Sequence, residues 1–151
     1  MKWEECKAEF EFDGAWLDIY VLETTAKDWN LFLKSLPAWS YSLSCAIDGL
    51  DSDVPSTFEA ASQVSQTKAI ALYIDIGPVA LKSHSFTATQ IEVDIDPREV
   101  TGEQQFDAIL GYMRNVGTLL KKSVVLTPEN EIGSPTILFD PVMSELNYQS
   151  S

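Results

Sequence analysis

Nucleophilic catalysis in this chain would have to use its single histidine, His84, which lies in the run Ser83-His84-Ser85. A serine or cysteine nucleophile needs a base within hydrogen-bond reach, so any such site must include His84. No Gly-x-Ser-x-Gly elbow is present. Cys6 lies near the N-terminus, and Cys45 falls on the apolar face of an expected strand, where lone cysteines normally pack in the core. We therefore expect His84 at the surface or on an edge strand, and both cysteines to be structural.

The residue types give little support for a metal or cofactor site. One histidine and two separated cysteines do not form a zinc pattern. The segment Asp48-Gly-Leu-Asp51-Ser-Asp53 is similar to a calcium loop, but it lacks the glycine at the sixth position and the correctly spaced glutamate. No phosphate-binding loop follows a strand. We expect a solvated acidic loop here and no cofactor, with a weak Ca²⁺ or Mg²⁺ contact left as an alternative.

Carboxylates are plentiful enough to serve as an acid–base pair. Asp18 and Asp75 are single acids inside otherwise apolar strands, where burial raises a carboxyl pKa and suits it to catalysis. Asp94 and Asp96 form a further candidate pair. The alternative is that Asp18 and Asp75 face solvent on an edge strand or cap a helix.

The charge of the chain limits its partners. Its 151 residues include 23 acidic and 10 basic ones, which gives a formal charge of −13. Such a surface repels nucleic acid phosphates and anionic membranes. It attracts cations or a basic protein surface, and it accelerates association with an oppositely charged partner.

The acidic residues concentrate in three clusters, which are our candidates for a partner-binding surface. Like charges in a row destabilise a fold unless something compensates them, and a basic partner would do so. The alternative for each cluster is an ordinary solvated face. The clusters are Asp48, Asp51 and Asp53; Glu92, Asp94 and Asp96; and Glu129 with Glu131.

The elements that must position these residues begin with a predicted hairpin. Residues 7–12 alternate between polar and apolar types, Asp13-Gly14 suits a type I′ turn, and residues 15–22 form the return strand. A helix follows over residues 25–36, because Trp29, Phe32, Leu33 and Leu36 share one face. We expect a third strand over residues 41–47, a polar loop over 48–55 and a short helix over 56–63.

The pattern in the second half of the sequence predicts three more strands. They are a central strand covered on both faces at residues 69–76, a weaker strand at 81–86 and a strong one at 91–96. Thr101 and Gln104 would form the capping box of a long helix that ends at Lys121-Lys122, and Gly111 and Gly117 would let it pack closely on the sheet. Strands at residues 123–127 and 136–139 complete the order.

This pattern predicts the α+β class, with two amphipathic helices packed on one face of a largely antiparallel sheet. Residues 1–141 would form a single domain, and residues 142–151 a loosely ordered tail. No apolar run is long enough to cross a bilayer, and the N-terminus lacks the regions of a signal peptide. We therefore expect a cytoplasmic protein with reduced thiols.

The segment Phe106–Asp140 resembles small uncharacterised bacterial proteins through Thr127-Pro128-Glu129-Asn130 and Phe139-Asp140-Pro141. In size, charge and α+β organisation the chain also resembles bacterial immunity proteins, the acidic partners of polymorphic or contact-dependent toxins. That resemblance implies stoichiometric inhibition, often by an acidic surface that covers the basic active site of a toxin nuclease. It assigns no individual residues.

The functional expectation is therefore an inhibitory binding protein and not an enzyme, with a basic, toxin-like protein as its partner. One alternative is a small enzyme that uses the carboxylates named above. Another is a homodimeric assembly module joined through exposed aromatics such as Trp3 and Trp39.

Overall fold

A single antiparallel sheet contains every strand of the chain that the structure describes. The structure is a computed structural model that describes residues 1–150. The strands run in the order β10-β9-β8-β1-β7-β5-β4-β2-β3, and β6 pairs with β7 beside this path. Their bounds are β1 Leu17–Leu22, β2 Ser42–Ile47, β3 Leu50–Ser52, β4 Ile70–Asp75, β5 Ala80–Ser83, β6 Phe86–Thr87, β7 Gln90–Ile95, β8 Val124–Pro128, β9 Ile137–Asp140 and β10 Glu145–Tyr148.

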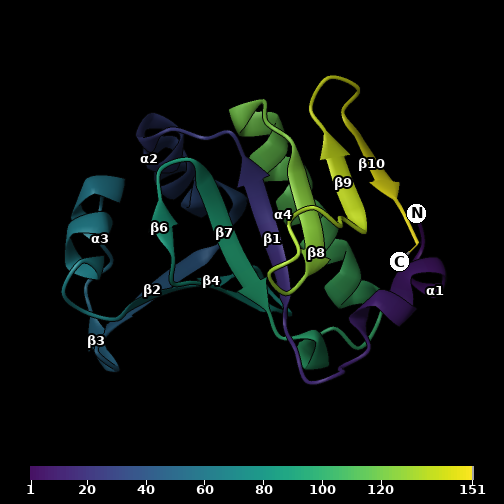
Figure 1. Cartoon of the computed structure of the whole chain (residues 1–151), viewed down its shortest axis with the longest axis horizontal. Coiled ribbons are helices and arrows are strands. Elements are labelled where there is room, and N and C mark those ends of the chain that lie inside the picture. The colour runs from purple at the N-terminus through teal and green to yellow at the C-terminus, as the bar shows by residue number, and fades with distance from the viewer. Residues whose placement is uncertain (151) are drawn as a thin grey trace.

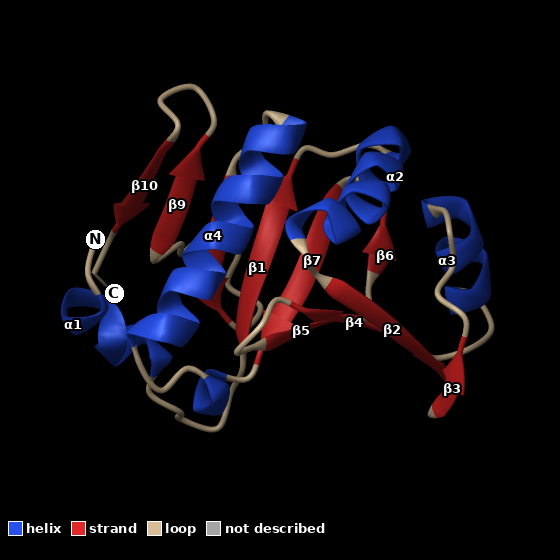
Figure 2. Ribbon diagram, turned by 180° about the vertical axis from the view of Figure 1, so that it is seen from behind, coloured by secondary structure: helices blue, strands red, loops and turns tan. Residues whose placement is uncertain are grey.

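Two amphipathic helices, α2 (Ala26–Ser35) and α4 (Glu103–Leu120), cover one face of this sheet (Figure 2). Their apolar faces bury Trp29 and Phe32 from α2, and Phe106, Ile109 and Met113 from α4. The remaining helical elements are α1 Trp3–Cys6, α3 Phe58–Ser65 and the 3₁₀ turns η1 Lys7–Phe10, η2 Leu36–Trp39 and η3 Pro97–Glu99. The predicted α+β class, with two helices on one face, is confirmed.

The opposite face of the sheet, which Figure 1 views directly, carries neither α2 nor α4. We call it the open face. Strand β1 shows why the two faces differ: Leu17, Ile19 and Val21 join the core, while Asp18 and Tyr20 point to the other side. Strand β7 alternates in the same way. None of the described helices is long and apolar enough to cross a membrane.

The predicted N-terminal hairpin is wrong. Residues 3–10 form α1 and η1, which bury Cys6 and Phe10 and pack Trp3 on Phe106. The alternation over residues 7–12 was coincidental, because Trp3, Cys6 and Phe10 share a helical spacing that ties this segment to α4. Strand β1 pairs instead with β7 and β8.

The Asp-Gly hairpin turn lies elsewhere, at Asp48-Gly49, within the segment expected to be a polar loop. Both residues have positive φ, 51° and 80°, as a type I′ turn requires, and Ile47 pairs with Leu50 across it. The central strand β4 is also covered on one face only, since Ala71 and Tyr73 are half-buried and Asp75 is exposed.

The expectation of a loosely ordered tail from residue 142 onwards does not hold, because Glu145–Tyr148 form β10 on the edge of the sheet. Asp140 accepts hydrogen bonds from the backbone N–H groups of Val142 and Met143, which shapes the turn before this strand. The Tyr148 hydroxyl donates to Glu9, which joins the end of the chain to its beginning.

Candidate functional site

Three carboxylates from two neighbouring strands converge on the open face. Asp18 of β1 lies directly opposite Asp94 of β7, and Tyr20 lies opposite Glu92. Because side chains alternate across a strand, this register places all four on the same side of the sheet. Oxygens of Asp18, Glu92 and Asp94 lie within 4.8 Å of one another. We call these three residues the carboxylate triad.

Asp18 is the most deeply buried member of the triad, with 3% of its surface exposed. Its Oδ2 accepts a hydrogen bond of 2.8 Å from the backbone N–H of Asn130 and one of 3.0 Å from the Tyr20 hydroxyl. Asn130 belongs to the loop between β8 and β9, which therefore folds over this end of the open face. Both donors bind the same oxygen of the Asp18 carboxylate.

Asp94 is held by a second set of groups. The Nδ1 atom of His84 lies 3.0 Å from Asp94 Oδ2, with 13% of the Asp94 side chain and 52% of the His84 side chain exposed. On the edge of β7 away from β1, Lys82 of β5 lies directly opposite Asp94. A cation and an imidazole therefore lie beside the triad, and residue spacing in the sequence did not predict either neighbour.

Burial raises the pKa of Asp94 to about 8, and its hydrogen bond with Asp18 and the charges of Asp18 and Glu92 act in the same direction. The charge of Lys82 opposes this shift. Burial, followed by the charge of Asp18, also raises the pKa of Glu92. Burial and the hydrogen bond to Asp18 raise the pKa of the Tyr20 hydroxyl. The triad is therefore short of positive charge.

The expected row of Glu92, Asp94 and Asp96 does not act as one unit. Asp96 forms a two-pronged ion pair with Arg98, with bonds of 3.0 Å to Nε and 2.9 Å to Nη2, and it caps η3 through the Arg98 N–H. The guanidinium lowers the pKa of Asp96. The pair of Asp94 and Asp96 is therefore not a shared acid–base site, and Asp94 has Asp18 as its neighbour instead.

The other two predicted clusters lie in different places. Asp48, Asp51 and Asp53 belong to the β2–β3 hairpin at the edge of the sheet, several strands away from the triad. Asp48 Oδ1 accepts from the Ala69 N–H and so stabilises the turn. Glu129 and Glu131 flank Asn130, whose N–H binds Asp18, so this third cluster adjoins the triad.

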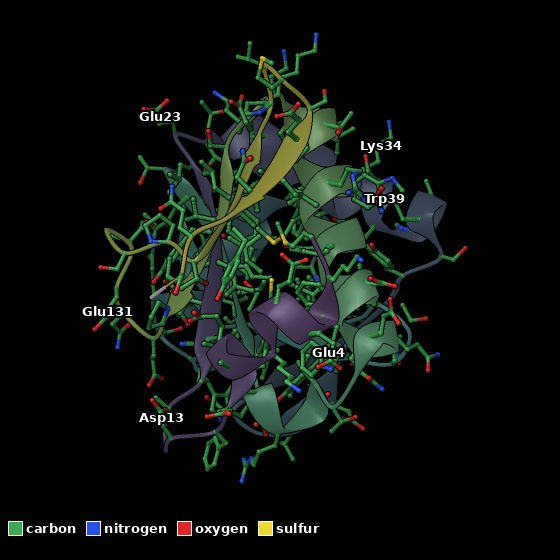
Figure 3. All side chains as sticks on the ribbon, turned by 90° about the vertical axis from the view of Figure 1, so that its right-hand side faces the viewer. Glu4, Asp13, Glu23, Lys34, Trp39 and Glu131 are labelled. Carbon is green, nitrogen blue, oxygen red and sulfur yellow. The ribbon has the colours of Figure 1, made fainter. Side chains whose placement is uncertain are left out.

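Figure 3 places Glu131 and Asp13 on the side of the sheet away from Lys34 and Trp39. A hollow of about 200 Å³ lies at the end of β1, beside Leu17 and Pro128. The hollow adds acidic groups beside Glu129 and was not predicted, because residues 7–12 were expected to form a strand. Its lining includes Glu9, Glu11, Asp13, Glu129 and Trp16.

The remaining candidates have structural explanations. Asp75 is exposed and its Oδ1 accepts from the Gly77 N–H in a turn. Ser83 is fully buried on the core side of β5 together with Leu81, whereas His84 contacts Asp94 on the open face. Cys6 and Cys45 are free and buried, as expected for packing residues.

The aromatic residues that suggested a homodimer are packed within the chain. The Trp3 ring lies 5.7 Å from that of Phe106, and the Trp39 ring lies 5.8 Å from that of Tyr41. Both tryptophans are half-buried. Each ring therefore has an intramolecular packing partner and leaves part of its surface exposed.

Comparison of the chain with known protein families, curated proteins and solved structures gives no match. The resemblance to immunity proteins thus gains no support from relatives, and the functional argument depends on the geometry of the open face.

Proposed function

We propose that this protein is a stoichiometric inhibitor that binds a basic, toxin-like protein through the open face of its sheet. The observation that carries the proposal is the carboxylate triad, whose oxygens lie within 4.8 Å of one another. A lysine or arginine side chain of a partner would provide both the missing positive charge and hydrogen-bond donors.

The surroundings of the triad suit a protein partner. Glu129 and Glu131 are exposed in the loop that folds over Asp18, and Asp13 is exposed at the same end of the sheet. Acidic groups at the rim of an interface mainly accelerate association, while contacts at the centre provide affinity. The formal charge of −13 acts in the same direction at long range.

The test compares two variants of equal charge. The face variant carries Asp13→Asn, Glu92→Gln, Glu129→Gln and Glu131→Gln. The matched control carries Asp51→Asn, Asp53→Asn, Glu103→Gln and Asp107→Asn, all at exposed positions away from the triad. The tagged full chain is used to capture partners from its source cells, and the retained protein is identified by mass and stoichiometry.

We expect a basic protein that binds one to one and is loosened by high salt. The face variant should then associate with the purified partner at least about tenfold more slowly, since charge complementarity acts on the association rate. The control should keep an association rate close to that of the wild type. Equal association rates for both variants would exclude the open face as the interface, and failure to recover any stoichiometric basic protein would count against inhibition.

One observation favours a second candidate, a small hydrolase that uses acid–base catalysis. The contact between His84 and Asp94, beside Asp18, joins an imidazole to a carboxyl group whose pKa is near 8. A general base is most effective when its pKa is near the operating pH. Turnover of ester or glycoside substrates that is lost in His84→Gln and in Asp94→Asn would favour this candidate, whereas a lack of turnover in the wild type would remove it.

A further inference from the structure

Asp18 and Asp94 are cross-strand neighbours on the open face, so their carboxylates are held together by the backbone. Directly opposed residues of an antiparallel pair have Cα atoms only about 4.5–5.5 Å apart. Their carboxyl oxygens lie within 4.8 Å of one another, and water has little access because Asp18 is 3% exposed. Two ionised carboxylates that share a dry site repel each other strongly, and such pairs usually hold a proton between them.

The hydrogen bonds assign different roles to the two acids. Asp18 Oδ2 accepts from both the Asn130 N–H and the Tyr20 hydroxyl. Asp94 has the His84 imidazole at 3.0 Å as its partner. Burial, followed by its hydrogen bond with Asp18 and the charge of Asp18, raises the pKa of Asp94 to about 8. Asp94 is thus the member that carries the proton.

Charged and titratable groups face the pair from each neighbouring element. Strand β1 contributes Tyr20, β7 contributes Glu92, and β5 and the residue after it contribute Lys82 and His84. Thr127 faces Asp18 from β8 and is uncharged, whereas the β8–β9 loop that binds Asp18 through Asn130 carries the exposed Glu129 and Glu131. Glu92 disfavours a second negative charge at Asp94, whereas Lys82 favours it. The repulsion from Asp18 and Glu92 is larger than the attraction from this one lysine.

We infer that Asp18 and Asp94 share one proton at neutral pH and form a pH-sensitive switch that adds one negative charge to the open face when alkaline pH removes that proton. The proton leaves Asp94 for solvent, and no other group is consumed. The inference concerns the free chain and holds whether or not a partner binds this face.

The test follows the aspartate carboxyl carbons by NMR from pH 3 to pH 10 in the full chain labelled with ¹³C-aspartate. We expect one aspartate signal to titrate near pH 8 and to be absent from Asp94→Asn. In Asp18→Asn, which keeps an oxygen that can accept from Asn130, the Asp94 signal should titrate at least about one pH unit lower. Glu92→Gln should lower it in the same direction and serves as the second variant if Asp18→Asn does not fold.

Two control variants separate the pair from its surroundings. Asp75→Asn removes an exposed aspartate and should leave the alkaline titration unchanged. His84→Gln should also preserve it, because the inference places the proton between the carboxylates. The inference is overturned if no aspartate titrates above pH 6, if the titration is lost in His84→Gln, or if it is unaffected by both Asp18→Asn and Glu92→Gln.

Discussion

At the scale of a single residue, the protonation of Asp94 couples the stability of the fold to pH. Its pKa is about 8 in the folded chain, against an ordinary value near 4 in the unfolded chain. The folded state therefore binds the proton more tightly. The stabilising contribution of that proton is complete below about pH 4 and is lost as the pH rises through about 8.

This difference predicts that the free energy of unfolding falls between pH 5 and pH 9. One pKa unit corresponds to about 1.4 kcal/mol. After allowance for relaxation of the site, the free energy of unfolding should therefore fall by about 1–3 kcal/mol. Asp94→Asn should be more stable than the wild type at pH 9 and should vary less with pH. Urea unfolding at several pH values measures both effects.

Asp75→Asn is the control for this measurement, because Asp75 is an exposed turn residue. A wild-type stability that stays constant or rises from pH 5 to pH 9 would contradict the prediction. So would an Asp94→Asn variant that follows the wild type at every pH.

At the scale of elements, the packing of α4 on the sheet depends on one of its two glycines. A Cβ atom at Gly117 would lie 2.2 Å from Cδ1 of Phe139 in β9, whereas a Cβ atom at Gly111 would meet nothing within 4 Å. The sequence pattern suggested close packing at both glycines. The structure confirms it for Gly117 and contradicts it for Gly111, because a glycine inside a helix does not reveal which strand lies behind it.

We predict opposite effects for the two substitutions. Gly117→Ala should destabilise the fold by about 1–3 kcal/mol through overpacking against Phe139. Gly111→Ala should stabilise it by about 0.5–1 kcal/mol, because alanine has the higher helix propensity. Thermal or urea unfolding of both variants provides the comparison. Equal effects of the two substitutions would show that the helix does not approach β9 as closely as the structure indicates.

Helix boundaries show how far local sequence could predict these elements. Thr25 and Asp28 form a complete capping box at the start of α2, where the sequence placed a helix start. Thr101 and Gln104 have similar spacing, yet α4 begins after Gly102, and no side chain caps it. Apolar periodicity identified both helices, but a capping pattern of two residues is too short to determine where the backbone leaves the helix.

The site itself could not be predicted from local sequence, because it depends on which strands pair. Strands were predicted at residues 15–22 and 91–96, close to β1 and β7, yet their pairing could not be predicted because many residues separate them. Asp18 was identified as a candidate for its burial, and Glu92 and Asp94 for their charge. Their convergence into one triad depends on the β1–β7 register, which is a property of the whole sheet.

At the scale of the whole molecule, the formal charge of −13 is a source of self-repulsion as well as of long-range attraction. The triad concentrates part of this charge on the open face, and Glu129 and Glu131 add to it nearby. At 0.1 M salt, repulsion between exposed charges more than about 10 Å apart is largely screened. The free chain should therefore be more stable in salt, whereas its proposed complex with a basic partner should be weaker.

We predict that raising NaCl from about 20 mM to about 500 mM increases the unfolding temperature by roughly 2–4 °C, equivalent to about 1 kcal/mol for a chain of this size. The face variant and its matched control each remove four negative charges, so both have a formal charge of −13 + 4 = −9. The face variant should respond less to salt than the control, because its four charges lie on or beside one end of the open face, whereas those of the control divide between the β2–β3 hairpin and α4. Equal responses would mean that net charge alone sets the repulsion, and an unfolding temperature that salt does not raise would show that the negative charges do not limit stability.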